Sequence, residues 1–206
     1  MRYLKILSLV AVSAAAMSVL AATASADRAT SPANTEYTST ITAKSEGAVT
    51  LHTVYQNPAE STICNKSNFE GAITADGPGK AISVPLNILK FEECEDEVKI
   101  LKKGTLTIND LGGGPNGTVT STGLELTMVL PTIFGNLHCI YTTNNTDIGT
   151  LTGSKTTGKT ATIHVDSELI PMTGGLSGAL CNANKGAELT GNYEITGPDY
   201  LDIDNS

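Results

Sequence analysis

The chain has 206 residues, with 13 lysine or arginine and 21 aspartate or glutamate residues, so its formal net charge is −8 at pH 7. A negative chain repels the phosphates of nucleic acids, and no basic patch in it exceeds Lys102-Lys103. Composition and charge therefore argue against a nucleic-acid-binding protein.

The first 26 residues have the three parts of an export signal. Arg2 and Lys5 precede an apolar run from Ile6 to about Ala22, and the small residues Ala24-Ser25-Ala26 form a cleavage site. Cleavage there leaves a mature formal charge of (13 − 2) − 21 = −10. No later run approaches the roughly 18 apolar residues of a membrane helix. We predict a secreted protein with no membrane span after cleavage; the alternative is a signal retained as an anchor.

The next residues, 27–35, are polar and lack periodicity, which predicts a disordered segment. From residue 36 to 206 the period of the chain is two, with threonine-rich strands and glycine-rich turns. Residues 161–171, "ATIHVDSELIP", show the alternation best, because one face carries Ala161, Ile163, Val165, Ser167 and Leu169.

The same alternation occurs in three other stretches: 81–88 (Ile82, Val84, Leu86, Ile88), 123–130 (Leu124, Leu126, Met128, Leu130) and 188–195 (Leu189, Gly191, Tyr193, Ile195). Many short strands without a helical period predict a single all-β domain over 36–206, an antiparallel β-sandwich or jelly roll.

Four cysteines, Cys64, Cys94, Cys139 and Cys181, lie in the mature chain, an even number that suits an oxidising compartment. Four cysteines allow three pairings, and sequence alone does not choose among them. We predict two disulfides, Cys64 with Cys94 and Cys139 with Cys181, because each loop is then closed within one half of the chain. The alternative is four buried thiols.

An acidic run, "FEECEDEV", surrounds the second cysteine with Glu92, Glu93, Glu95, Asp96 and Glu97. Crowded carboxylates can bind calcium through their oxygens, although the spacing does not match an EF-hand loop. They can also form a solvated, like-charged loop that keeps a sheet edge soluble. Calcium is therefore the one cofactor that the sequence suggests.

The stretch "GSKTTGKT", residues 153–160, matches the phosphate-binding loop of nucleotide-binding proteins. That loop needs a strand before it and a helix after it, so that the start of the helix meets the phosphates. Here the residues after Thr160 alternate with period two. We therefore predict a hairpin connection between two strands and no nucleotide site.

Because the chain has no tryptophan and 6 tyrosines, a sugar-binding platform would have to come from tyrosine residues. Tyr141 and Tyr193 share a face with apolar neighbours and are predicted to lie in the core. Tyr55 and Tyr200 are the candidate sugar contacts. The histidines at 52, 138 and 164 are predicted to face outward on separate strands, which does not indicate a shared metal site.

The second half of the chain resembles a group of uncharacterised secreted bacterial proteins, many of them from actinobacteria. The stretches concerned are "CIYTTNNTDIGTLTGSKTTGKTATIHV", "IPMTGGLSGALC" and "GNYEITGPDYLDID". The resemblance implies an exported all-β domain and no catalytic residues. Members of the group have a tryptophan where this chain has Leu189. A looser similarity connects the chain to exported bacterial activators of alkane oxidation.

Taken together, these patterns predict a secreted, non-catalytic protein with a binding or structural role at the cell surface or in the extracellular matrix. Its partner would be an envelope polysaccharide or a protein. One alternative is a carbohydrate-recognition module that uses Tyr55 or Tyr200 together with the acidic run from Glu92 to Glu97. A second is a small hydrolase with carboxylate catalysis by Asp166 or Glu168.

Overall fold

A computed structural model describes residues 28–31, 35–36, 39–53, 60–74, 81–111, 115–133, 135–154, 159–172, 181, 186–198 and 201–204. The proposed signal, residues 1–26, lies outside them. The described residues form these strands: β1 (Arg28–Ser31), β2 (Thr35–Glu36), β3 (Thr40–Ser45), β4 (Val49–Thr53), β5 (Glu60–Ala72), β6 (Ile82–Cys94), β7 (Glu97–Asp110), β8 (Gly117–Thr132), β9 (Gly135–Thr142), β10 (Thr146–Thr152), β11 (Thr162–Pro171), β12 (Ala187–Gly197) and β13 (Asp202–Asp204).

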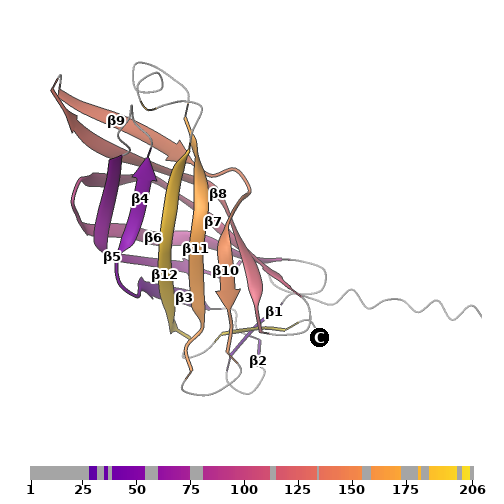
Figure 1. Cartoon of the computed structure of the whole chain (residues 1–206). Coiled ribbons are helices and arrows are strands. Elements are labelled where there is room, and N and C mark those ends of the chain that lie inside the picture. The colour runs from indigo at the N-terminus through magenta and orange to yellow at the C-terminus, as the bar shows by residue number, and fades with distance from the viewer. Residues whose placement is uncertain are drawn as a thin grey trace, which may run out of the picture.

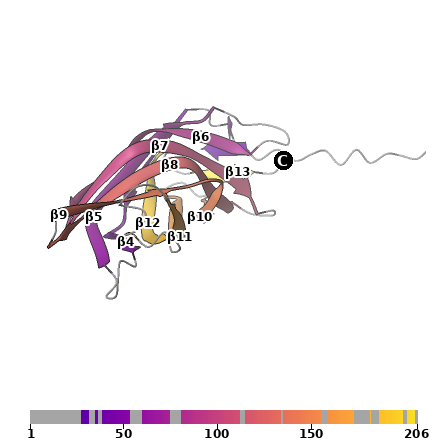
Figure 2. The ribbon, with the colours of Figure 1, turned by 90° about the horizontal axis from the view of Figure 1, so that it is seen from above.

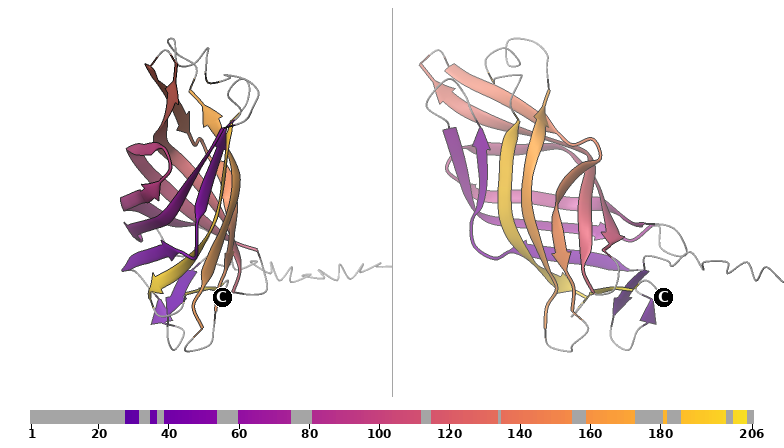
Figure 3. Two further views of the ribbon diagram at one scale, coloured as in Figure 1. Left: turned by 60° about the vertical axis from the view of Figure 1, so that its left-hand side comes forward. Right: turned by 45° about the vertical axis from the view of Figure 1, so that its right-hand side comes forward.

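Eight of these strands close into an antiparallel barrel, in the order β8-β7-β6-β5-β3-β12-β11-β10 and back to β8 (Figures 1 and 2). The closing pair is β10 with β8, in register from Thr146↔Ser121 to Leu151↔Gly117. Strand β4 pairs with β5 and β12, and β9 pairs with β8 and β11. The hairpin of β8 and β9 projects beyond the barrel at one end (Figure 3).

The predicted all-β fold is confirmed, but the sheet closes into a barrel where an antiparallel sandwich or jelly roll was predicted. Strands β6 and β7 cross behind β4, β12 and β11, as the two layers of a sandwich would (Figure 1). The hydrogen-bonded ladder nevertheless continues from one layer to the other, because β10 pairs with β8. Closure of this kind removes most of the free sheet edges that a sandwich keeps, although β6 and β7 are in register only from Ile82↔Ile108 to Pro85↔Thr105.

The predicted alternation holds along β11. Ala161, just before the strand, and Ile163, Val165 and Leu169 within it are buried, with Ser167 among them. The residues between them are partly or fully exposed. One face of the strand therefore packs against the core and the other meets water, as in a half-buried strand.

Along β6 the predicted face is correct only up to Leu86. The pairing of β5 with β6 shifts between Glu70↔Ile88 and Gly71↔Leu86, so that Asn87 is an extra residue. A bulge of this kind moves the side chains that follow to the opposite face. Leu89 therefore points to the barrel interior, in place of the predicted Ile88.

The segment predicted to be disordered, residues 27–35, contains a strand. Residues 28–31 form β1, which is in register with β13 from Arg28↔Asp204 to Thr30↔Asp202. Ala29 and Thr30 are buried, at 0% and 2% exposure. The prediction was wrong for β1. Its sequence has no period of two, but its backbone forms hydrogen bonds with β13, which lies far along the chain.

The connection between β10 and β11 is the predicted hairpin. The two strands are antiparallel and in register from Gly149↔Val165 to Thr152↔Thr162. The "GSKTTGKT" stretch is followed by the strand β11, whereas a phosphate-binding loop is followed by a helix. Residues 155–158 lie outside the described part of the chain.

Two disulfides join Cys64 to Cys94 and Cys139 to Cys181, which confirms the predicted pairing. The first links β5 to the end of β6, where the two cysteines are register partners. The second links β9 to Cys181, which precedes β12. Disulfides persist in non-reducing environments, and this pair indicates such a compartment for the protein. Among the described residues, no helix has the length and apolar character needed to cross a membrane.

Candidate functional site

The barrel interior encloses an apolar cavity of about 50 Å³. Every barrel strand except β3 contributes to its lining. All lining side chains are hydrocarbon apart from Ser121 and Tyr193; the set is Phe69, Leu86, Leu89, Phe91, Leu106, Val119, Ser121, Leu124, Ile148, Ile163, Val165, Leu189 and Tyr193. Such a lining can hold an apolar molecule by removing its surface from water.

The two polar groups of the lining are already hydrogen-bonded within the protein. The Tyr193 hydroxyl donates to Ser67 Oγ at 2.8 Å, and Ser121 Oγ lies 2.9 Å from Thr143 Oγ1. The Tyr193 ring also packs against Phe69, with centroids 5.6 Å apart. Burial raises the pKa of the Tyr193 phenol to about 12, and the hydrogen bond that the phenol donates to Ser67 only partly opposes this rise. The phenol therefore stays neutral at physiological pH.

The cavity opens to solvent along the second half of β6. Leu86, Leu89 and Phe91 are the partly exposed members of the lining, while the remaining lining residues are buried. On one side of this half-strand, β5 is in register with β6 from Cys64↔Cys94 to Gly71↔Leu86. On the other side, β7 is in register with β6 only from Ile82↔Ile108 to Pro85↔Thr105.

We call the unpaired boundary between β6 and β7, beyond Pro85 and Thr105, the β6–β7 seam. Strand β7 follows β8 along this stretch, since their register continues to Glu97↔Val129. Strand β6 follows β5 instead. The two strands therefore have no register partners in each other along the seam, where three inward-facing side chains of β6 are partly exposed.

The predicted calcium residues lie at the turn between β6 and β7. Several of their carboxylates contact neighbouring side chains: Glu93 pairs with Lys66, Asp96 Oδ2 accepts from Thr62 Oγ1 at 2.7 Å, and Glu97 pairs with Lys99 at 2.8 Å. The pKa of Lys66 is raised, mainly because the Lys66 ammonium group donates a hydrogen bond to Glu93. Within the described ranges, no group of three or more His, Cys, Asp or Glu residues is arranged to hold a metal ion. Calcium binding by Glu92 to Glu97 stays a prediction.

The predicted sugar contacts, Tyr55 and Tyr200, lie outside the described residues. The two tyrosines that were predicted to lie in the core are buried there, with Tyr141 at 0% exposure and Tyr193 at 4%. The Tyr141 hydroxyl hydrogen-bonds with Thr53 Oγ1. Burial raises the pKa of Tyr141 and outweighs the lowering effect of this hydrogen bond.

The outer face of β4, β12 and β11 is polar. His164 Nδ1 lies 2.7 Å from Asn192 Oδ1, and His52 Nδ1 lies 2.6 Å from Ser61 Oγ. Asp166 and Glu168, the carboxylates of the hydrolase alternative, are both exposed on this face. Glu168 Oε1 accepts a hydrogen bond from the Gly186 amide at 3.1 Å. These groups lie on a wet sheet surface, whereas the apolar cavity lies on the other side of the sheet.

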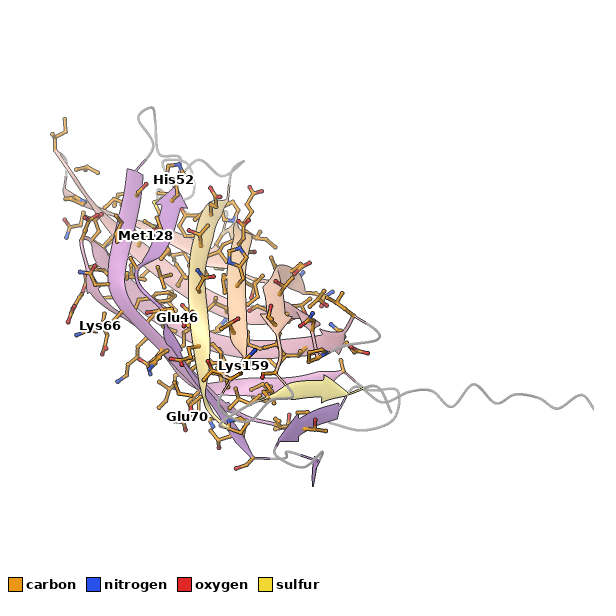
Figure 4. All side chains as sticks on the ribbon, turned by 60° about the horizontal axis from the view of Figure 1, so that its bottom comes forward. Glu46, His52, Lys66, Glu70, Met128 and Lys159 are labelled. Atoms are coloured by element: carbon orange, nitrogen blue, oxygen red, sulfur yellow. A yellow bond between two sulfur atoms is a disulfide. The ribbon has the colours of Figure 1, made fainter. Side chains whose placement is uncertain are left out.

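Figure 4 shows Lys66 and Lys159 well apart from each other. Comparison of the chain with protein-family models, with curated proteins and with solved structures finds no match. Function has to be inferred from the geometry itself.

The sequence predicted several of the cavity residues as core, among them Ile163, Val165, Leu189 and Tyr193, but it did not predict a cavity. One signal was present. In "PLNILKFEE" the apolar residues fall at Leu86, Leu89 and Phe91 as well as at Ile88, and this break in the period of two marks the bulge that starts the opening.

Proposed function

We propose that the protein is an exported, non-catalytic binding protein whose barrel interior holds a small apolar molecule. The observation that supports this proposal is the composition of the cavity lining. Its hydrocarbon side chains can bind an apolar ligand, and its two hydroxyl groups are engaged with Ser67 and Thr143. Among the described residues that line the cavity, the hydroxyl groups of Ser121 and Tyr193 are both hydrogen-bonded to other side chains of the protein, which supports a binding role for the interior.

Export is part of the same proposal. The charged, apolar and small-residue sections of the first 26 residues support it, as do the two disulfides and the resemblance to secreted bacterial proteins. A barrel of this kind would act at the cell surface or in the extracellular matrix.

Calorimetric titration of the oxidised 27–206 chain with 1-octanol tests the proposal, because this ligand is apolar, slim and uncharged. We expect saturable binding to the wild type. The variant Leu89→Trp places a larger ring at the opening and should abolish binding.

Leu101→Trp is the matched control for the blocking variant. Leu101 lies on β7 and is 50% exposed, so that the same ring is added outside the lining. Circular dichroism should show all three proteins folded. A wild type that does not bind 1-octanol, or a Leu89→Trp variant that binds it as tightly, would contradict the proposal. The structural role in the matrix would then be favoured.

A further inference from the structure

The volume of the cavity limits the shape of its occupant. A cavity needs a volume of about 10–15 Å³ for each water-sized group that it holds. A protein cavity that binds benzene has a volume of about 150 Å³. The cavity of about 50 Å³ therefore admits about three to five groups of that size. The end of an unbranched alkyl chain fits this limit, whereas a ring does not.

The opening offers a path for the rest of such a chain. Beside the seam, β6 and β7 place a row of partly buried apolar side chains that pack against the core: Leu86, Leu89, Phe91, Val98 and Ile100. Methylene groups lying along this row would lose part of their contact with water. The apolar surface thus continues from the interior to the rim.

The positively charged side chain of Lys103 lies at the rim of the opening. Lys103, on β7, is exposed, and its Nζ donates a hydrogen bond across the seam to the backbone oxygen of Asn87. Asn87 lies between Leu86 and Leu89, two of the three residues at the opening. An ammonium group has three hydrogens, so Lys103 can keep this bond and donate to an anion as well.

The neighbouring lysines of the same strand are engaged differently. Lys99 pairs with Glu97 and Lys102 pairs with Glu125. Glu92, at the acidic end of β6, is five residues from Asn87, which corresponds to about 16 Å along a strand. That distance exceeds the screening length of about 8 Å at physiological salt, so the acidic turn repels an anion at the rim only weakly.

We propose that the ligand is a single unbranched aliphatic carboxylate, with its tail in the barrel interior and its carboxylate paired with Lys103 Nζ at the β6–β7 seam. This inference rests on the proposed function and specifies the class of its ligand. The apolar lining selects the chain, and the lysine at the rim selects the charged end.

Chain shape is tested by titrating the oxidised 27–206 chain with hexanoate, octanoate and cyclohexanecarboxylate. Each additional buried methylene contributes about 0.8 kcal/mol, or about fourfold in affinity. Octanoate should therefore bind up to about 16-fold more tightly than hexanoate. Cyclohexanecarboxylate should bind more weakly than either. Equal or tighter binding of the ring compound would overturn the proposed chain shape.

The charged end is tested by comparing octanoate with 1-octanol in the wild type, in Lys103→Gln and in Lys159→Gln. An exposed ion pair contributes about 0.2–1 kcal/mol, so Lys103→Gln should weaken octanoate binding by about 1.4- to fivefold and leave 1-octanol binding unchanged. Lys159 is exposed on the connection before β11, and its replacement makes the same change in net charge. Lys159→Gln should leave both affinities as they are.

The outcomes separate this inference from the proposed function. If 1-octanol binds and Lys103→Gln leaves octanoate binding unchanged, the carboxylate assignment is wrong and the apolar site remains. If Lys159→Gln weakens octanoate as much as Lys103→Gln does, net charge rather than the rim lysine attracts the anion, and the assignment is again wrong. If neither ligand binds the wild type, both proposals are overturned.

Discussion

Tyr193 connects the lining of the cavity to the stability of the barrel. Its hydroxyl donates to Ser67 and its ring contacts Phe69. Burial raises the pKa of the phenol to about 12 from its ordinary value near 10. In the unfolded chain the phenol therefore loses its proton at lower pH than in the folded protein.

This difference in pKa predicts a loss of stability at alkaline pH. Below pH 10 both states are protonated and the contribution of Tyr193 is complete; between pH 10 and 12 the unfolded state binds fewer protons, so the free energy of unfolding falls. The expected loss is about 1.4 kcal/mol for each pH unit in that window. Denaturant unfolding at pH 9, 10, 11 and 12 measures it.

Tyr193→Phe is the control for the alkaline transition. The variant removes the ionising group and keeps the ring against Phe69, at the cost of the hydrogen bond to Ser67. Its stability should be lower than that of the wild type at pH 9 and should fall less steeply above pH 10. An equal slope in the two proteins would show that other groups cause the transition.

At the residue scale, sequence predicts burial better than it predicts partners. The parity of Tyr141 and Tyr193 with apolar neighbours placed both rings correctly in the core. Their hydroxyl partners could not be predicted, because Thr53 and Ser67 are 88 and 126 residues away along the chain. Which hydroxyls meet depends on the pairing of distant strands.

At the scale of elements, the two disulfides should contribute nearly equally to stability. They close loops of 30 and 42 residues, and the entropy that a crosslink removes from the unfolded chain depends only on the logarithm of loop length. That relation gives about 4 kcal/mol for each. Guanidinium chloride unfolding of the double variants Cys64→Ser/Cys94→Ser and Cys139→Ser/Cys181→Ser measures the two contributions.

A difference of more than about twofold between the two double variants would contradict the loop-entropy argument. It would mean that one bridge acts mainly on the native state, for example by holding the end of β6 against β5. Unfolding of the wild type under reducing conditions provides the reference, because it should lose the sum of both contributions if the bridges act independently.

Periodicity predicted strands well, but it did not predict the bulge in β6 or the strand β1. The inward-facing residues of β11, and those of β12 as far as Ile195, follow the period of two and were predicted with their faces. In β6 the bulge at Asn87 depends on its register with β5, and β1 depends on β13, which lies at the other end of the sequence. Both features come from pairing between strands, which a single sequence does not encode locally.

At the scale of the whole molecule, the closure of the sheet into a barrel could not be predicted from the sequence. Strand patterns and turn spacing are the same for a sandwich and for a barrel. The deciding contact is between β10 and the first half of β8, with β9 occupying the second half of β8. Closure brings apolar faces together around one interior, and the incomplete pairing of β6 with β7 leaves that interior accessible.

Amide hydrogen exchange should reveal the seam directly. Successive amides of an antiparallel strand point to alternate sides, so those of β6 between Leu86 and Cys94 should alternate between slow exchange toward β5 and fast exchange toward the seam. Strand β11, which has neighbours on both sides, should be protected throughout its pairing with β10. Uniformly slow exchange in β6 would show that the seam is closed by hydrogen bonds in solution and would move the entrance of the ligand elsewhere. Slower exchange along the seam after addition of octanoate would place the ligand there.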